Sequence, residues 1–474
     1  MSRSGRAAAL LSFALCLSTP AAAELGLDEV LEAAREHFPL IEAVRNEQLA
    51  RSEDLRAARG AFDLRIGLTG DIRPEGFYEN NAGDVLLEQD TTLWGSKLFA
   101  GYRYAQGDFP SYDADRLTDE SGEARIGVEV PLLRDGAIDD ARAGIQDARI
   151  SLAQMEPETL LQRVDVELAA SVAYWEWLAA GQTLEIAERL LDVALERQKQ
   201  LEARVAKGAE ARIVLTDNRR LIVERSAKKR GAERDFQMAS IRLSLYHRDE
   251  TGQPVRAGRE LLPERFPIER MPADEEFSRD LELVEEHHPI LRRFENERDR
   301  VMLKIAQARN ATLPSLDLRV ELSRDFGDAN GGIDEKGKFS SASRSETEVK
   351  ALMSLRMPVQ QRKARGRLAA AKLRLSKIAN ESRIAEERII ASALEAIERL
   401  KAAYEQTGLA RENAELARTL RDAESRRLDL GLSNLIDVNI REIQAATAET
   451  ELVDAQRAFF RATAEYEARV ASMP

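Results

Sequence analysis

The sequence predicts an α+β protein that combines long helical hairpins with a few short strands and is built as two similar halves. Three observations predict this class: an internal repeat, two long stretches of helix-forming residues, and short runs in which apolar and polar residues alternate. Because all three recur in each half, we expect a pseudo-symmetric molecule rather than one arranged around a single pocket.

The repeat is visible as matching segments at a nearly constant separation. Residues 36–40 (EHFPL) recur as 286–290 (EHHPI), and residues 63–66 (DLRI) recur as 317–320 (DLRV). Further along, Pro131 corresponds to Pro358 and Gly208 corresponds to Gly431. The expected organisation is a first repeat over 24–247, a linker or collar over 248–276, and a second repeat over 277–474.

Residues 1–23 have the layout of a secretory signal peptide. Two arginines precede an apolar stretch, and the segment ends in three alanines. The only cysteine, Cys16, lies in this segment after Leu15, which is too large for a lipoprotein signal, so neither a lipid anchor nor a disulfide is expected. The formal net charge is −13, and no stripe of basic residues stands out in the sequence. Both observations disfavour nucleic-acid binding.

Two stretches, 137–205 and 363–428, are rich in Ala, Leu, Glu, Arg and Gln and predict rods roughly 100 Å long. In the second rod, Ile390, Leu394, Ile397 and Tyr404 have the spacing of a coiled-coil seam. Each rod ends near a glycine, with hairpin tips expected near 208 and 431. Second helices are expected over 212–247 and 434–471, antiparallel to the rods.

Strands are expected within 62–133 and 314–358, where apolar and charged residues alternate with period two. The clearest runs cover residues 62–68, 92–104, 125–130, 316–322 and 348–357, and polar stretches at 74–89, 107–122 and 326–345 suit loops. Such strands fit a soluble sheet on a core or a barrel wall with lipid on one side and water on the other.

Context favours the membrane interpretation, because no other segment supplies a layer to cover the apolar face. Four or five strands cannot close a barrel, so several copies must contribute. If both flanking helical regions lie on one side of the membrane, the number of strands per chain is even. Either 62–72 and 92–104 form one interrupted strand, or one of the runs lies outside the barrel.

Together these features resemble the TolC-like outer-membrane efflux proteins over essentially the whole mature chain. The most specific matches are residues 130–136 (VPLLRDG), where a strand turns into a helix, and 430–438 (LGLSNLIDV) at a hairpin tip. The resemblance implies a homotrimer in the outer membrane of a Gram-negative bacterium, with four strands per chain in one twelve-stranded barrel and a periplasmic helical tunnel. It implies a passive duct for efflux or type I secretion, joined through a periplasmic adaptor to an inner-membrane transporter, with no enzymatic activity and no cofactor.

The resemblance also suggests roles for individual residues. Leu430, Gly431 and Leu432 match the motif that meets the adaptor, whereas the first tip around Gly208 departs from it. Asp437 matches an acid of the closed periplasmic aperture, and Asp217 lies near the corresponding place in the first repeat.

These positions also have structural interpretations: both tips suit well-capped turns, and Asp437 suits a contact at a helix start. Pro131 and Pro358 mark strand-to-helix turns, because proline ends a strand and lacks the amide that a helix start leaves unpaired.

Two other protein classes remain open: a periplasmic adaptor, which also uses a long helical hairpin, and a secreted coiled-coil scaffold. An enzyme is disfavoured, because no nucleophile–base set, phosphate-binding loop or metal-ligand spacing is present. The group Glu285, Glu286, His287 and His288 favours a structural role, since its counterpart in the first repeat also precedes a proline.

Overall fold

The computed structural model describes residues 24–110, 116–328 and 347–470, so the predicted signal peptide lies outside the described part. The α+β class is confirmed, with long helices and one six-stranded antiparallel sheet. The chain divides into two compact units, one formed by residues 1–39, 163–277 and 393–474 and the other by 40–162 and 278–392. Each unit combines segments from both halves of the sequence.

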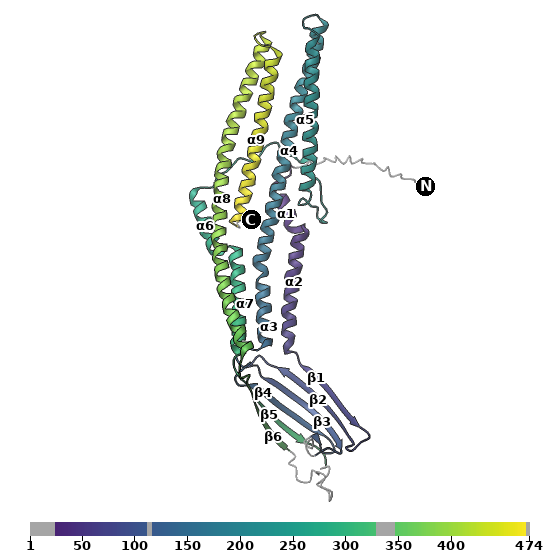
Figure 1. The fold of residues 1–474 in the computed structure, drawn as a ribbon. Helices are drawn as coiled ribbons and strands as arrows, with labels where there is room; N and C mark the ends of the chain where they lie inside the picture. Colours follow the sequence, from purple (N-terminus) through teal and green to yellow (C-terminus); the bar gives the residue numbers. More distant parts are fainter. Residues whose placement is uncertain (1–23, 111–115, 329–346, 471–474) are drawn as a thin grey trace, which may run out of the picture. The chain divides into compact units, whose positions relative to one another are not determined.

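The first unit is helical and contains two antiparallel hairpins. In Figure 1, α4 and α5 lie side by side, and so do α8 and α9. The helices that lie in this unit wholly or in part are α1 Leu27–His37, α4 Met155–Ala206, α5 Ile213–Leu243, α8 Arg362–Asp429 and α9 Leu435–Arg469. The predicted second helix of each hairpin is therefore present, within four residues of the expected ends.

Aromatic side chains form much of this unit's core. Trp177 is fully buried in α4, and Trp175 stacks on Phe460 of α9 with ring centroids 4.3 Å apart. Phe266, from the segment between the repeats, stacks on both Trp175 and Phe460. Residues 248–276 therefore contribute to the packing of this unit through Phe266.

The first predicted rod is broken, whereas the second is continuous. Helix α3 (Asp140–Ala153) ends just before α4 begins at Met155. Pro157 explains the break, because it has no N–H to donate to the carbonyl of Ala153 four residues earlier. Helix α8 spans the predicted second rod without interruption.

The predicted seam of α8 is only partly correct: Ile397 is buried, as predicted. Leu394 and Tyr404 are 47% and 43% exposed, whereas the buried positions of this region are Ile389, Ala393, Ala396, Ile397, Leu400 and Thr407. Small alanines allow closer packing than the bulkier residues chosen from the sequence. Leu394 and Tyr404 instead lie on a more exposed face of the helix.

The second unit holds the sheet, whose strands follow one another in sequence order, β1 to β6, each antiparallel to the next. Figure 1 shows them side by side next to the ends of α2, α3 and α7. The bounds are α2 Pro39–Arg59, β1 Arg65–Arg73, β2 Asn80–Asp90, β3 Lys97–Gly107, β4 Glu123–Pro131, α6 Asp274–His287, α7 Pro289–Asn310, β5 Ser315–Asp325 and β6 Thr347–Arg356. Val301 and Ile305 of α7 pack on Ala371 and Ile378 of α8 beside it.

The number of strands corrects the sequence analysis, which expected about four per chain. Residues 62–72 and 92–104 are not one interrupted strand, because β2 lies between β1 and β3 and pairs with both. Strand β2 falls in the stretch expected to be a loop, since its apolar residues Val85, Leu86 and Leu87 are consecutive and give no alternation. Residues 92–96 form the turn before β3.

The histidine pair before α7 has the structural role that was favoured. His288 is the N-cap of α7, and its Nδ1 accepts a hydrogen bond of 3.2 Å from the backbone N–H of Ile290. A proline follows directly, as is common at the first position of a helix.

Both hairpins reverse at a glycine in the left-handed region, with φ of +73° at Gly208 and +72° at Gly431. At the second tip, the N–H of Gly431 donates to Leu428 O and that of Leu432 donates to Arg427 O. This pair of bonds is the Schellman motif, and the first tip has the equivalent pair.

Replacing Gly431 with alanine is therefore expected to cost about 1 kcal/mol, because a Cβ is disfavoured at positive φ. No atom within 4 Å of the new Cβ would add a clash. Gly231→Ala is the matched control: Gly231 lies inside α5, also with open space, and alanine there should stabilise by about 1 kcal/mol. Thermal unfolding followed by circular dichroism measures both, and a Gly431→Ala protein as stable as wild type would contradict the argument.

Candidate functional site

The register of the sheet sorts its side chains onto two chemically different faces. Ile66 lies opposite Leu87, Leu98 opposite Val128, and Val320 opposite Ala351. The same face carries large side chains that are exposed in the single chain: Ile66, Leu68, Ile72, Val85, Tyr102, Tyr104, Ile126, Leu322, Val349, Met353 and Leu355. We call this the apolar face. It runs over all six strands.

The other face, here the charged face, carries acids and bases in register. Arg103 lies opposite Glu123 and donates to it through Nε at 3.0 Å, and Arg125 is hydrogen-bonded to Asp84. At the strand ends next to the helices, Asp90 accepts from Arg65 at 2.6 Å. Positively and negatively charged side chains alternate along the charged face, so neither charge dominates there.

An aromatic ring is buried within the charged face. Phe99 is 6% exposed and lies opposite Gly127, where any Cβ would collide with its ring. The guanidinium of Arg319 covers the ring at 4.1 Å from its centroid, a cation–π contact. The arginine therefore shields the ring and presents charge to the water side.

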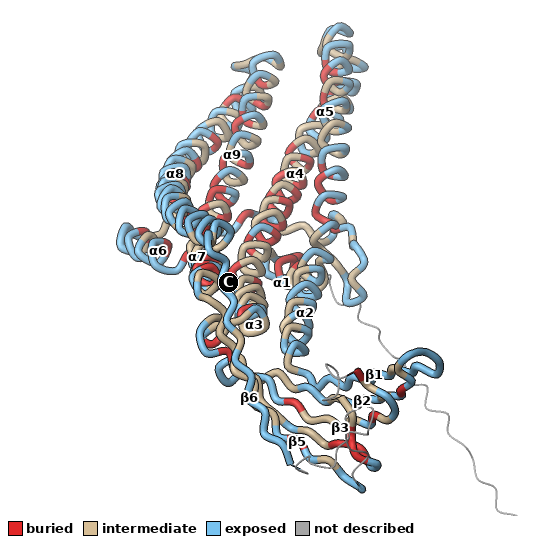
Figure 2. Tube along the Cα trace, turned by 60° about the horizontal axis from the view of Figure 1, so that its bottom comes forward, coloured by how far each residue is buried: buried red, intermediate tan, exposed pale blue. Residues whose placement is uncertain are grey.

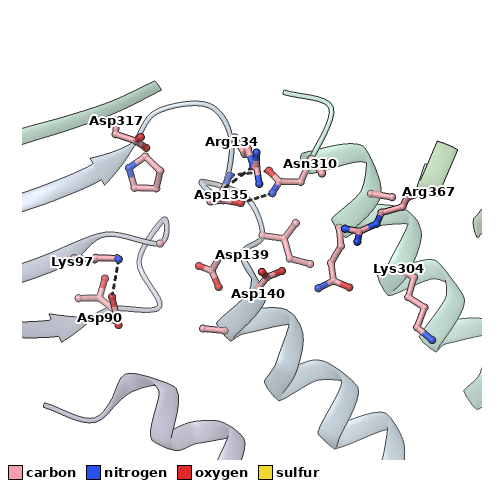
Figure 3. A pocket seen from close by; sticks show the side chains of 18 of the residues that line it. Asp90, Lys97, Arg134, Asp135, Asp139, Asp140, Lys304, Asn310, Asp317 and Arg367 are labelled. Atoms are coloured by element: carbon pink, nitrogen blue, oxygen red, sulfur yellow. Dashed lines mark hydrogen bonds and ion pairs between the residues drawn. The ribbon is translucent and has the colours of Figure 1, made fainter. Parts of the chain in front are cut away.

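A polar hollow of about 780 Å³ lies where the strands meet the helices. Figure 3 shows Asp90, Lys97 and Asp317 from the strand side, and Lys304 and Arg367 from the helix side. Its lining of acids and bases continues the charged face toward α3, α7 and α8.

The turn from β4 into α3 is fixed by polar contacts beside this hollow. Asp135, with φ of +69°, donates its N–H to Asn310 Oδ1 at 2.9 Å, and the Asn310 amide donates back to the Asp135 carboxylate at 2.7 Å (Figure 3). Arg142 donates to the carbonyls of Asp135 and Gly136. This network joins the strand end to α7.

The two prolines predicted at strand-to-helix turns end strands rather than begin helices. Pro131 is the last residue of β4, nine positions before α3 begins at Asp140. Pro358 follows β6 and precedes α8, which begins at Arg362. Neither proline is in the first turn of a helix. The missing amide therefore helps to end the strand and has no role in starting a helix.

The second hairpin tip presents apolar side chains on a firmly held turn. Leu430 and Leu432 are 74% and 66% exposed, and Ile436 is exposed beside them. The hydroxyl of Ser433 donates to Glu424, and Arg427 donates to the carbonyl of Leu432 at 3.2 Å. The tip at Gly208 instead carries Lys207 and Glu210, so the two tips differ in chemistry.

The two predicted aperture acids lie at the starts of different helices. Asp437 is exposed in the first turn of α9 and accepts a hydrogen bond of 2.9 Å from the side-chain amide of Asn434, the N-cap. Asp217 is exposed in the first turns of α5. Within the described residues no hydrogen bond or ion pair joins them.

A buried ionic cluster, absent from the sequence analysis, connects the two hairpins. Glu442 of α9 accepts hydrogen bonds from Arg197 of α4 and, at 2.8 Å, from Arg225 of α5. The side chains of Glu442 and Arg225 are 8% and 3% exposed. One signal could have revealed it: Glu442 follows Val438 by four residues and precedes Ala445 by three, which places a charge in an otherwise apolar row.

The clearest pKa shifts lie in the helical unit and have structural causes. A hydrogen bond from Arg259 lowers the pKa of Glu188, and burial raises the pKa of Tyr174 to about 12. The Tyr174 hydroxyl donates to the carbonyl of Leu25 at 2.9 Å.

The described residues contain no cluster of three or more His, Cys, Asp or Glu side chains suited to a metal ion. Among the helices that the structure describes, none combines the length and apolarity needed to cross a membrane.

The sequence and the fold are similar to those of known proteins. Residues 281–466 match the family model described as outer membrane efflux protein. This match covers most of the second repeat. No curated protein matches at the level of sequence.

Solved structures extend the likeness in fold to 94–96% of the chain. It is similar to the outer-membrane channel OprN (TM-score 0.64, 13% identity, 94% of this chain and 90% of that one). VceC from Vibrio cholerae (0.63, 15%, 94% and 96%) and the open state of Neisseria gonorrhoeae MtrE (0.63, 15%, 96% and 93%) are equally similar.

The resemblance to TolC-like outer-membrane efflux proteins is thereby confirmed. The family match and the shared fold support an efflux duct in the outer membrane of a Gram-negative bacterium. The family is one of conduits rather than enzymes.

The Glu442 cluster yields a stability prediction. Glu442→Gln should destabilise the protein by about 3–5 kcal/mol, because it leaves the buried Arg225 guanidinium without a counter-charge. Glu395→Gln is the control, since Glu395 pairs with Arg399 on an exposed helix surface and should change stability by less than about 0.5 kcal/mol. Urea unfolding measures both, and equal effects would contradict a special role for the cluster.

Proposed function

We propose that this chain forms a homotrimeric duct in the outer membrane, through which an inner-membrane transporter, joined by a periplasmic adaptor, expels its cargo. The observation that carries the proposal is the two-faced sheet. Its apolar face is exposed on a single chain, whereas its charged face carries ion pairs between neighbouring strands.

Physical chemistry assigns these faces to different solvents. Burying apolar side chains in lipid is favourable, by roughly 25 cal/mol per Å² removed from water. Charged side chains cost about 2–4 kcal/mol each at the lipid midplane, so the charged face must meet water. The sheet is thus suited to be part of a wall between lipid and an aqueous lumen.

Contacts between copies would also cover an exposed row on α8. Leu409, Leu416 and Leu420, spaced by seven and four residues, share one face of the helix and are 69%, 58% and 48% exposed. Large apolar side chains in such a row indicate a surface that another helix covers. A neighbouring copy in the trimer is the occupant that the resemblance implies.

The adaptor would dock on the second tip. Leu430, Leu432 and Ile436 present an apolar surface on a turn held by backbone and side-chain hydrogen bonds. Such a rigid apolar surface suits a partner with an apolar tip of its own. Gly208 and its polar neighbours offer a weaker, more hydrophilic contact.

Asp437 and Asp217 would line the periplasmic aperture. Both carboxylates are exposed, and threefold symmetry would turn each into a ring of three acids. A ring of acids in a narrow aqueous passage attracts cations. The bond from Asn434 supports this role, because it holds the Asp437 carboxylate in a defined position.

Fractionation tests the proposal against its two rivals. We expect tagged protein in the outer-membrane fraction, as trimers that survive detergent at room temperature and dissociate on heating. Release by osmotic shock as a water-soluble protein would instead support a periplasmic adaptor or a secreted scaffold.

A second experiment tests the aperture. In planar bilayers, Asp437→Asn should weaken block by divalent or trivalent cations, because it removes the charge while keeping the side-chain size. Asn434→Ala frees the Asp437 carboxylate but keeps its charge, so it should weaken the block less than Asp437→Asn does. Unchanged block in Asp437→Asn would remove this residue from the aperture.

A further inference from the structure

We propose that β1 of one copy pairs with β6 of the next, so that three copies of this six-stranded sheet close an eighteen-stranded barrel. This inference rests on the trimer proposed above. It departs from the four strands per chain, and twelve per trimer, that the family resemblance implies.

The additional strands are an inserted hairpin. By sequence, β1 corresponds to β5 and the end of β4 corresponds to the end of β6. In the second repeat these two strands are neighbours, whereas in the first repeat β2 and β3 lie between them. Each inserted strand has 11 residues, the length that crosses a membrane when tilted.

The inserted strands are integral to the sheet. Strand β2 pairs with β1 over the whole of β1, from Arg65 opposite Glu88 to Arg73 opposite Asn80. It pairs with β3 along the full length of both strands. Arg125 of β4 reaches past β3 to Asp84 of β2, which ties the hairpin to the rest of the charged face.

The two outer strands have the directions that closure requires. Because an even number of strands alternates in direction, β1 and β6 run oppositely, and β1 of one copy can pair antiparallel with β6 of another. They are also the most exposed strands of the sheet, as Figure 2 shows. Their lengths match, at nine and ten residues.

Side-chain chemistry selects one register for this seam. Placing Leu68 opposite Met353 keeps the apolar face continuous, with Ile66 meeting Leu355 and Ile72 meeting Val349. On the charged face the same register pairs acids with bases, Asp71 with Lys350 and Arg73 with Glu348. Opposite charges directly across a pair of strands are favourable, and like charges are not.

Neighbouring registers that preserve the faces are worse. A shift by two residues in one direction places Asp71 opposite Glu348, and in the other direction Arg73 opposite Lys350. The chosen register does bring Arg65 opposite Arg356. Each of these has an acid of its own, Asp90 at 2.6 Å and Asp317 at 3.8 Å, which offsets the repulsion.

The geometry of closure is an independent check. Starting at Arg65, the successive partners across the sheet are Glu88, Phe99, Gly127, Glu321 and Lys350. The proposed seam continues from Lys350 to Asp71 of the next copy, six residues beyond Arg65. Around three copies the strand register therefore shifts by three times six residues, which is eighteen. This total shift is the shear number of the barrel, and it equals the number of strands. Barrels with this equality have strands tilted by about 36°, within the range of membrane barrels.

The consequence is a wider lumen at the membrane. At equal tilt the barrel diameter grows roughly in proportion to the number of strands, so eighteen strands give about 1.5 times the width of twelve. Barrels of this size leave an open aqueous channel.

Cysteine crosslinking in the intact trimer tests the seam. Leu68→Cys combined with Met353→Cys, treated with a short thiol crosslinker in outer-membrane vesicles, should yield covalent trimers on a denaturing gel. The control is Leu68→Cys with Val349→Cys, on the same face but displaced by four residues or about 13 Å, and it should give only background crosslinking. Equal yields from the two pairs would overturn the register.

A second set of pairs tests the twelve-stranded alternative, in which β3 rather than β1 meets the neighbour. Each of Leu98→Cys, Ala100→Cys, Tyr102→Cys and Tyr104→Cys is combined with Met353→Cys. Covalent trimers from this set, with none from Leu68 and Met353, would overturn the eighteen-stranded wall while leaving the outer-membrane duct intact. Protein that forms no trimer at all would instead contradict the proposed function.

Charge reversal provides a readout that does not depend on crosslinking. Asp71→Lys and Lys350→Asp should each lower the temperature at which the trimer dissociates in detergent, and the double variant should recover most of the loss. A double variant no better than the sum of the two single losses would contradict the proposed pairing of these residues.

Discussion

The pairing of the six strands determines what each side of the sheet can touch. In an antiparallel sheet, a slip of one residue moves every side chain of a strand to the opposite face. Here the register places apolar residues opposite one another, as in Ile66 with Leu87 and Val320 with Ala351, and acids opposite bases, as in Arg103 with Glu123 and Glu321 with Lys350. No helix or second sheet is needed to explain the sequence of these strands, because lipid and water are sufficient partners for the two faces.

The helical unit obeys a different constraint, that of closely packed rods with few polar groups between them. Alanines share the buried row of α8 with isoleucines and Leu400, and aromatic rings from residues 248–276 and from both hairpins fill the wider spaces. Glu442 interrupts this apolar packing and binds arginines from α4 and α5. A buried charge of this kind contributes little net stability, but it penalises any other alignment of α9 against the first hairpin.

Much of this architecture could be predicted from the sequence, since periodicity reports directly on helices and on two-faced strands. The ends of α5, α8 and α9 follow from glycine, asparagine and the helix-forming runs. Strand β2 could not be found in this way, because three consecutive apolar residues and two glycine or alanine positions hide the alternation. The α8 seam was predicted correctly only at Ile397, because small buried residues such as Ala393 and Ala396 were not counted in it, and the break before α4 depended on Pro157. A contact of Asp437 at a helix start was one of two interpretations of that residue, whereas the Glu442 cluster required knowledge of which helices meet.

The hairpin formed by β2 and β3 begins at Asn80 and ends at Gly107, which lie opposite each other at the same end of the strands. It therefore leaves the flanking helices connected as they would be without it. A gene encoding this chain could therefore gain or lose such a unit without rethreading any other part. The circumference of the proposed barrel could therefore change while the number of helical rods per chain stays the same.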